Sequence, residues 1–220
     1  MIPSLLLLAL LQSVAPPATG PEITVTGRTE CGPPFATLYI APMGEPSRTD
    51  GFTDPMAQWF GRADADHDGK LTWPEFAADA DRFFDTIDLD HSGEIDPQEM
   101  QHYEYEVAPE IKLYQPGQDR RGLKGRARRR AREAAKARAD YVAPYGAGEY
   151  ASLNIPEPVA SADLDLNRGV SRKEFAKVAG DRFVLLDPDH RGYLTLDTLP
   201  KSPAQEEIDA CRAKAEKKRR

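Results

Sequence analysis

The chain contains two twelve-residue segments with the same unusual pattern. DADHDGKLTWPE begins at Asp64, and DLDHSGEIDPQE begins at Asp88, 24 positions later. Each has oxygen-bearing side chains, mostly acids, at alternate positions, then a glycine, an apolar residue and a final glutamate. Close carboxylates repel one another, so a folded chain tolerates this spacing when water screens the charges or a cation lies between them. The repeated order of residue types favours a cation.

The order of oxygen donors fits calcium. Ca²⁺ binds about six to eight oxygens, from side chains at loop positions 1, 3 and 5, a carbonyl at position 7 and both oxygens of a glutamate at position 12. Glycine at position 6, Gly69 or Gly93, permits the sharp turn between them. The predicted ligands are Asp64, Asp66, Asp68, the Lys70 carbonyl and Glu75 in loop 1 (64–75), and Asp88, Asp90, Ser92, the Glu94 carbonyl and Glu99 in loop 2 (88–99).

Apolar residues at helical spacing predict helices on both sides of these loops. One helix starts near Thr53 and runs into Asp64. A single amphipathic helix of about 12 residues, FAADADRFFDTI, connects the two loops. A third helix runs from Glu99 to about Val107 and stops before Pro109.

The pattern returns in the second half of the chain, which indicates a duplication. DLDLNRGVSRKE begins at Asp163 and DPDHRGYLTLDT begins at Asp187, again 24 positions apart. In loop 3 (163–174), Arg168 replaces the glycine at position 6. A positive φ costs a non-glycine residue about 1–2 kcal/mol, so we expect weaker binding there. The predicted ligands of loop 3 are Asp163, Asp165, Asn167 and Glu174.

Loop 4 (187–198) departs further from the pattern. Arg191 stands at position 5 and Thr198 at position 12, which leaves two carboxylates, those of Asp187 and Asp189. Two carboxylates and a cationic side chain are a poor replacement for the water shell of calcium. We therefore predict that loop 4 has a structural role only.

The loops resemble those of the EF-hand calcium-binding superfamily, with calmodulin-like ligand positions. This resemblance implies an all-α fold of helix-loop-helix repeats whose loops pair through backbone contacts at position 8. The expected fold is two loop pairs packed into one compact domain, with an irregular N-terminal arm and a basic helical insertion. The expected cofactor is Ca²⁺.

The short connection between consecutive loops predicts how the loops pair. Twelve helical residues span roughly 18 Å, so loops 1 and 2 would lie at opposite ends of one helix. Pairing should therefore be crosswise, with Leu71 opposite Leu194 and Ile95 opposite Val170. The same spacing resembles the lanthanide-binding lanmodulin family, and Pro188 at position 2 of loop 4 matches its signature. Loops 1 to 3 lack that proline, so lanthanide binding is the alternative and calcium is the main hypothesis.

The remaining segments suggest export. The apolar run from Leu5 to Leu11 is too short to span a bilayer and is typical of a secretory signal peptide. Disulfides persist outside the cytosol, so Cys31 and Cys211 can be bridged, although the sequence leaves this open. The predicted segments are a signal peptide (1–20), an irregular arm (21–52), a first EF-hand pair (53–109), a basic helical insertion (110–150), a second pair with a degenerate loop (151–200) and a basic C-terminal helix (201–220).

Besides lanthanide binding, two functions remain open from the sequence. The main one is an exported, periplasmic or secreted calcium-binding protein that acts as a buffer or as a calcium-stabilised binding module. We expect this protein to be a monomer. The alternative is a calcium-dependent adaptor that binds an unidentified protein or anionic polymer through the basic segment 120–138. That segment lacks interleaved aromatic residues, which disfavours nucleic acid. The four histidines lack metal-ligand spacing and no nucleophile motif is present, so we predict no enzymatic activity.

Overall fold

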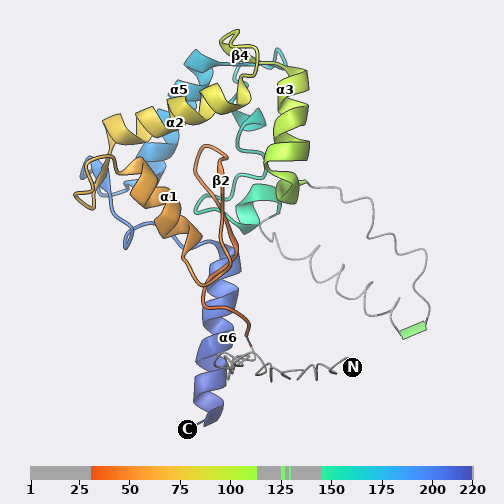
Figure 1. Ribbon diagram of the computed structural model, residues 1–220, viewed down its shortest axis with the longest axis vertical. Coiled ribbons are helices and arrows are strands. Elements are labelled where there is room, and N and C mark those ends of the chain that lie inside the picture. The colour runs from red at the N-terminus through yellow and green to blue at the C-terminus, as the bar shows by residue number, and fades with distance from the viewer. Residues whose placement is uncertain (1–30, 113–124, 127–128, 130–144, 220) are drawn as a thin grey trace, which may run out of the picture.

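The first two loops lie between three α-helices. The computed structural model describes residues 31–112, 125–126, 129 and 145–219. Helix α1 (Pro55–Ala63) leads into loop 1 and strand β3 (Leu71–Thr72), α2 (Trp73–Ile87) leads into loop 2 and strand β4 (Glu94–Ile95), and α3 (Pro97–His102) follows (Figure 1). Helix α2 starts three residues earlier than the predicted segment because the closing residues of loop 1 also form its first turn.

The local sequence explains where these helices begin. Asp54 caps α1, because its side chain accepts hydrogen bonds from the amides of Met56 at 2.9 Å and Ala57 at 3.4 Å. Asp96 caps α3 in the same way. Helix α3 continues as a π-helix, η1 (Tyr103–Val107), and a 3₁₀ turn, η2 (Pro109–Ile111). The helix predicted to run to about Val107 is thus helical throughout, with a wider last turn.

The second half repeats the arrangement around loops 3 and 4. Short 3₁₀ turns, η4 (Gly146–Glu149) and η5 (Ala160–Ala162), precede loop 3, which runs through β5 (Val170–Ser171) into α5 (Arg172–Leu186). Loop 4 contains β6 (Tyr193–Leu194), and α6 (Pro203–Arg219) ends the chain. A Cys31–Cys211 disulfide, with Cα atoms 5.8 Å apart, joins α6 to the start of the described chain.

The four loops pair crosswise, as predicted. Strand β3 pairs antiparallel with β6, with Leu71 opposite Leu194. Strand β4 pairs antiparallel with β5, with Ile95 opposite Val170. Helix α2 therefore connects two separate loop pairs, and it packs side by side with α5 through edge-to-face aromatic contacts between Phe76 and Phe183 and between Phe84 and Phe175.

The arm at 21–52 differs from the irregular segment that we expected. Its described part contains an antiparallel hairpin of β1 (Leu38–Ile40) and β2 (Pro46–Arg48), which lies between α1 and α3 (Figure 1). Tyr39 and Ile40 are fully buried. Pro, Gly and Thr residues surround the short apolar stretch Leu38–Ile40, so the local sequence did not predict a strand there. The burial of this strand depends on helices that are distant in the sequence.

The turn of the hairpin fits closely against η1. Gly44 has a φ of 104°, and a Cβ there would lie 2.7 Å from the Tyr103 hydroxyl. That hydroxyl donates a 2.8 Å hydrogen bond to the Gly44 carbonyl. Glycine is therefore required both by the backbone conformation and by the close approach. The buried side chains of hairpin, helices and loop strands form one hydrophobic cluster, as expected for one packed unit.

The predicted insertion lies outside the described residues, except for its two ends and Gly125, Arg126 and Arg129. The predicted signal peptide and most of the basic segment 120–138 lie outside them as well. These predictions therefore remain predictions.

Candidate metal centres

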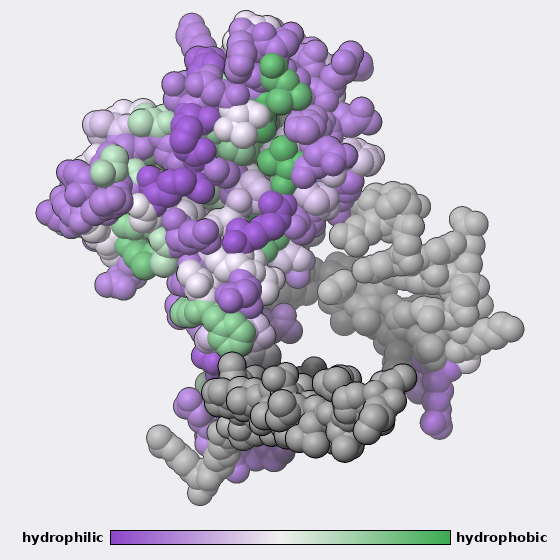
Figure 2. Space-filling view, viewed as in Figure 1, coloured by the Kyte–Doolittle hydropathy of each residue, from purple (hydrophilic) through white to green (hydrophobic). Residues whose placement is uncertain are grey.

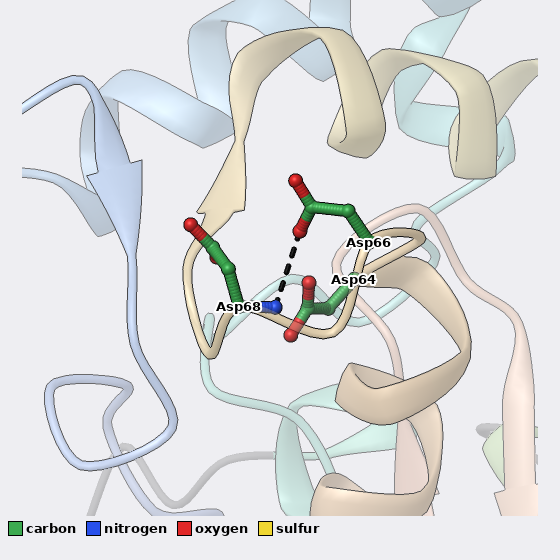
Figure 3. A group of neighbouring side chains, drawn as sticks. All are labelled: Asp64, Asp66 and Asp68. Carbon is green, nitrogen blue, oxygen red and sulfur yellow. Dashed lines mark hydrogen bonds between the residues drawn. The ribbon is translucent and has the colours of Figure 1, made fainter.

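Loop 1 brings three predicted ligands together. Asp64, Asp66 and Asp68 each direct a carboxylate oxygen to a common region, and these oxygens lie within 4.8 Å of one another (Figure 3). Backbone amides hold the carboxylates in place. The Gly69 amide donates to Asp64 Oδ2 at 2.9 Å, and the Asp68 amide donates to Asp66 Oδ1 at 3.1 Å. The loop is thus folded around a concentration of negative charge.

One oxygen in this group lacks a partner among the described residues. Asp64 is only 4% exposed, and its Oδ1 atom is buried without a hydrogen-bond donor. A buried anionic oxygen without compensation is costly, and a cation supplies the missing interaction. The donor set of loop 1 therefore fits a hard divalent cation such as calcium.

The closing residue Glu75 lies at the junction of the loop and α2. Its Oε2 accepts from the Thr72 amide at 2.9 Å and the Thr72 hydroxyl at 2.6 Å, and its Oε1 accepts from the Ala65 amide at 3.1 Å. The Thr72 side chain, then its amide, lower the pKa of Glu75, so the carboxylate is favoured. The remaining predicted ligand is the Lys70 carbonyl. The amide of Lys70 donates a 2.7 Å hydrogen bond to Asp68 Oδ1.

Loop 2 gathers a different trio that includes the closing glutamate. Oxygens of Asp88, Asp90 and Glu99 lie within 4.8 Å of one another. Asp88 is fully buried and Glu99 is 6% exposed. The Ser92 hydroxyl donates to the Glu94 carbonyl at 3.0 Å, so these two predicted ligands contact each other. Loop 2 is therefore the most buried of the acidic loops.

Loop 3 retains the same frame despite Arg168. Oxygens of Asp163, Asp165 and Glu174 lie within 4.8 Å, and the Asn167 side chain donates to Asp165 at 3.3 Å. Arg168 adopts a φ of 76°, as its position predicted, and its amide donates to Asp163 Oδ2 at 2.9 Å. The non-glycine residue therefore preserves the turn at the cost of an unfavourable backbone conformation.

Loop 4 carries its own cation. The Arg191 Nε atom lies 3.6 Å from Asp187 Oδ1, and an Nη atom donates to the Thr198 hydroxyl at 3.0 Å. The guanidinium thus bridges positions 1 and 12. Burial of Asp187 opposes ionisation, but the amides of Gly192 and Arg191 and the charge of Arg191 outweigh it and lower its pKa. A guanidinium therefore already lies beside the position 1 carboxylate of loop 4, and the structural role of this loop stays a prediction.

Position 4 of every loop has a constraint that the sequence analysis missed. His67, His91, Leu166 and His190 all have positive φ values, of 58°, 55°, 62° and 52°. Histidine is among the non-glycine residues that tolerate this region best. The recurrence of histidine at the same loop position was the available signal.

The comparisons with known proteins agree with this geometry. Residues 56–78 and 80–102 match the family model described as EF hand. These two spans cover loops 1 and 2 together with parts of their flanking helices. No curated protein and no solved structure matches the chain. The matches at these two helix-loop-helix units support an EF-hand calcium-binding family.

Proposed function

We propose that this protein is an exported calcium-binding protein with two good sites, at loops 1 and 2, and a weaker third site at loop 3. The observation that carries the proposal is the buried, unpartnered Asp64 oxygen within a group of three aspartates. Repetition of the acidic trio in loops 2 and 3 supports it. Bound calcium would supply a positive charge to these groups of carboxylates.

A buffer or a calcium-stabilised module is favoured over a calmodulin-type switch. Such a switch exposes an apolar groove between its helices when calcium binds. In this chain the hairpin packs against α1, and the rings of Tyr39 and Trp59 have centroids 5.7 Å apart. The Glu45 carboxylate accepts hydrogen bonds from Arg62 on α1 and Arg82 on α2, each at 2.5 Å. The two helices that flank loop 1 are thereby tied to the hairpin.

A buried arginine adds to this restraint. Arg182 on α5 is 3% exposed and donates to the carbonyls of Pro42 and Pro158, each at 2.7 Å. Burial lowers its pKa to about 10, which still leaves it charged at neutral pH. The face shown in Figure 2 is mainly hydrophilic, with apolar side chains in small separate groups. These features support a rigid scaffold whose calcium sites stabilise the fold.

The disulfide supports the proposal of export. Disulfides persist in the periplasm and outside cells, and are rare in the reducing cytosol. Cys31 and Cys211 lie at opposite ends of the described chain, so their bond ties the hairpin end to α6. Within the described residues, no helix combines the length and apolar composition needed to cross a bilayer. We propose a binding role without catalysis.

Calcium titration calorimetry of the purified, oxidised protein tests the proposal. We expect two tight equivalents and one weaker equivalent. Glu75→Gln and Glu99→Gln should each remove one tight equivalent, and Glu174→Gln the weak one. Asp189→Asn in loop 4 is the matched control and should leave the stoichiometry unchanged. Absence of calcium uptake at millimolar supply would contradict the proposal.

A further inference from the structure

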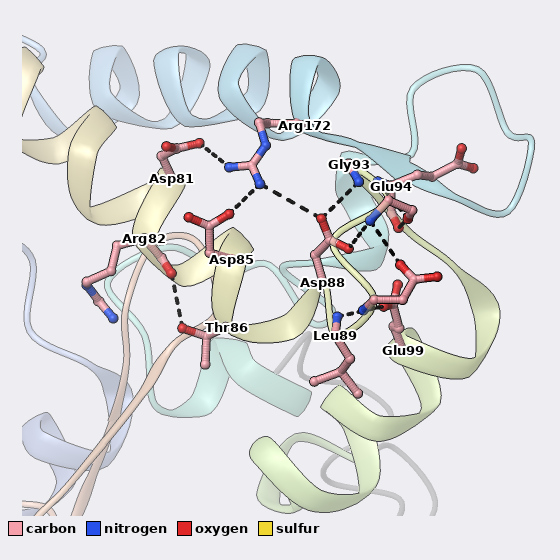
Figure 4. A network of polar contacts seen from close by, with 12 residues as sticks. Asp81, Arg82, Asp85, Thr86, Asp88, Leu89, Gly93, Glu94, Glu99 and Arg172 are labelled. Carbon is pink, nitrogen blue, oxygen red and sulfur yellow. Dashed lines mark hydrogen bonds and ion pairs between the residues drawn. The ribbon is translucent and has the colours of Figure 1, made fainter.

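Arg172, the first residue of α5, reaches from loop 3 into loop 2. Its two Nη atoms contact Asp81, at 2.6 Å, and Asp85 on α2, and its guanidinium lies 4.4 Å from the centre of the Phe84 ring. The Nη2 atom is also 3.8 Å from Asp88 Oδ2, the position 1 carboxylate of loop 2 (Figure 4). The side chain thus spans α2 and the entrance of loop 2.

The backbone of Arg172 contacts the same loop. Its amide donates a 3.0 Å hydrogen bond to the Gly93 carbonyl. The Gly93 amide in turn donates to Asp88 Oδ2 at 3.0 Å. Arg172, Gly93 and Asp88 therefore form a closed set of contacts that joins position 10 of loop 3 to positions 1 and 6 of loop 2.

The charge of Arg172 opposes calcium at loop 2. Asp88 is fully buried, and a buried carboxylate is stabilised by a nearby cation. Arg172 supplies part of that compensation before calcium binds and repels calcium afterwards. The exposed Asp81 and Asp85 hold the guanidinium in this place.

We propose that Arg172 is a positioning residue that lowers the calcium affinity of loop 2 and couples it to the state of loop 3. The coupling arises because Arg172 also belongs to the first turn of α5, which Glu174 of loop 3 closes through its hydrogen bonds to Ser171. Calcium at loop 3 would engage Glu174 and so act on the helix end that carries Arg172. This inference rests on the proposed calcium binding.

The amides of Gly69 and Gly93 allow the two loops to be followed separately. Each donates to the position 1 aspartate of its own loop, so its NMR resonance reports that loop. In a calcium titration, Arg172→Met should lower the Gly93 midpoint by roughly three- to tenfold and leave the Gly69 midpoint unchanged. Methionine keeps an apolar stem beside Phe84. Arg172→Lys retains the charge without the planar fork and should lower the Gly93 midpoint less than Arg172→Met does.

Lys173→Gln is the matched control, because it removes one positive charge from the adjacent, exposed position of the same helix. It should move the Gly93 midpoint less than Arg172→Met.

The coupling is tested with Glu174→Gln. This change should shift the Gly93 midpoint when Arg172 is present and have little effect in the Arg172→Met background. A second measurement needs no Arg172 variant: in the wild type, the Arg172 guanidinium resonance should shift at the same calcium concentration as the Gly93 amide.

The outcomes separate this inference from the proposed function. If neither glycine amide responds to calcium, calcium binding itself fails. If both respond, but Arg172→Met moves the Gly93 midpoint no more than Lys173→Gln does, Arg172 is only a helix-helix ion pair. If the variant does not fold, a wild-type Arg172 resonance that is unaffected by calcium overturns the inference.

Discussion

Loops 1 and 4 pair with each other through β3 and β6, yet they compensate their buried charge in opposite ways. Each starts with a buried aspartate whose Oδ2 accepts from the position 6 glycine amide. In loop 1 the other oxygen of Asp64 has no partner among the described residues, whereas in loop 4 the corresponding oxygen of Asp187 faces Arg191. The shared backbone therefore requires a positive charge, which an ion or a guanidinium can supply.

Loop 2 lies between these extremes. Its acidic trio resembles a metal site, but Arg172 approaches its position 1 aspartate from outside. In loop 4, Arg191 contacts Thr198 at position 12, where the other loops have a glutamate. In loop 2, Arg172 lies beside Asp88, and Glu99 remains in the acidic trio. In our proposal, the position of the cation, inside or outside the loop, separates a structural loop from a modulated binding loop.

The largest expected effect comes from removing the charge of Asp64, whose Oδ1 lacks a partner among the described residues. Asp64→Asn should weaken calcium binding at loop 1 by on the order of a hundredfold, because charge count and ligand set determine the affinity of these loops. Calorimetry should show the loss of one tight equivalent. Asp187→Asn should leave calcium stoichiometry intact, and loss of an equivalent in that variant would break the contrast between the two loops.

Restoring the acids of loop 4 should create a site. In the double variant Arg191→Asp with Thr198→Glu, the loop regains side-chain ligands at positions 1, 3, 5 and 12 and keeps Gly192 at position 6. We expect one additional calcium equivalent, with a dissociation constant of about 10⁻⁵–10⁻³ M. The single variant Arg191→Ala serves as control and should lower the thermal midpoint without adding an equivalent. No gain in the double variant would mean that the backbone of loop 4 has diverged as well.

A smaller effect should follow from relieving the backbone at loop 3. Arg168→Gly removes the cost of a positive φ at a non-glycine residue and should raise calcium affinity there roughly tenfold. The measurement is calorimetry in a Glu75→Gln and Glu99→Gln background, where loop 3 is the remaining predicted site. Arg168→Gln removes the charge while keeping the strain and should recover less of the affinity.

The smallest effect concerns pH in calcium-free buffer. Hydrogen bonds from Thr72 and Ser171 lower the pKa values of Glu75 and Glu174 below the ordinary 4.5. A carboxylate with a depressed folded pKa contributes stability that is complete above its unfolded pKa and is lost as pH falls through the folded value. The thermal midpoint should therefore decrease as the pH is lowered below about 4.5. This decrease should be less steep in Thr72→Val or Ser171→Ala. Loop 4 lacks this carboxylate, so Thr198→Val should leave the pH profile unchanged.

The sequence by itself determined the features that depend on short-range spacing. Twelve consecutive residues place the donors of each loop, so the spacing predicts Asp64, Asp88 and Asp163 as first ligands, and each lies within its group of acidic oxygens. The backbone strain at Arg168 followed from its loop position. Crosswise pairing also followed, because the connecting helix is too short to bring loops 1 and 2 together.

The tertiary structure alone decided the features that depend on distant partners. The buried residues of the hairpin at 38–48 depend on its packing against α1 and on the contact of its turn with Tyr103 of η1, and its local composition resembles a loop. Nothing in the local sequence marks Arg172, because its contact with Asp88 joins positions 84 residues apart. Local spacing therefore determines which atoms can hold an ion, whereas the electrostatic environment of those atoms arises only when separate segments pack together.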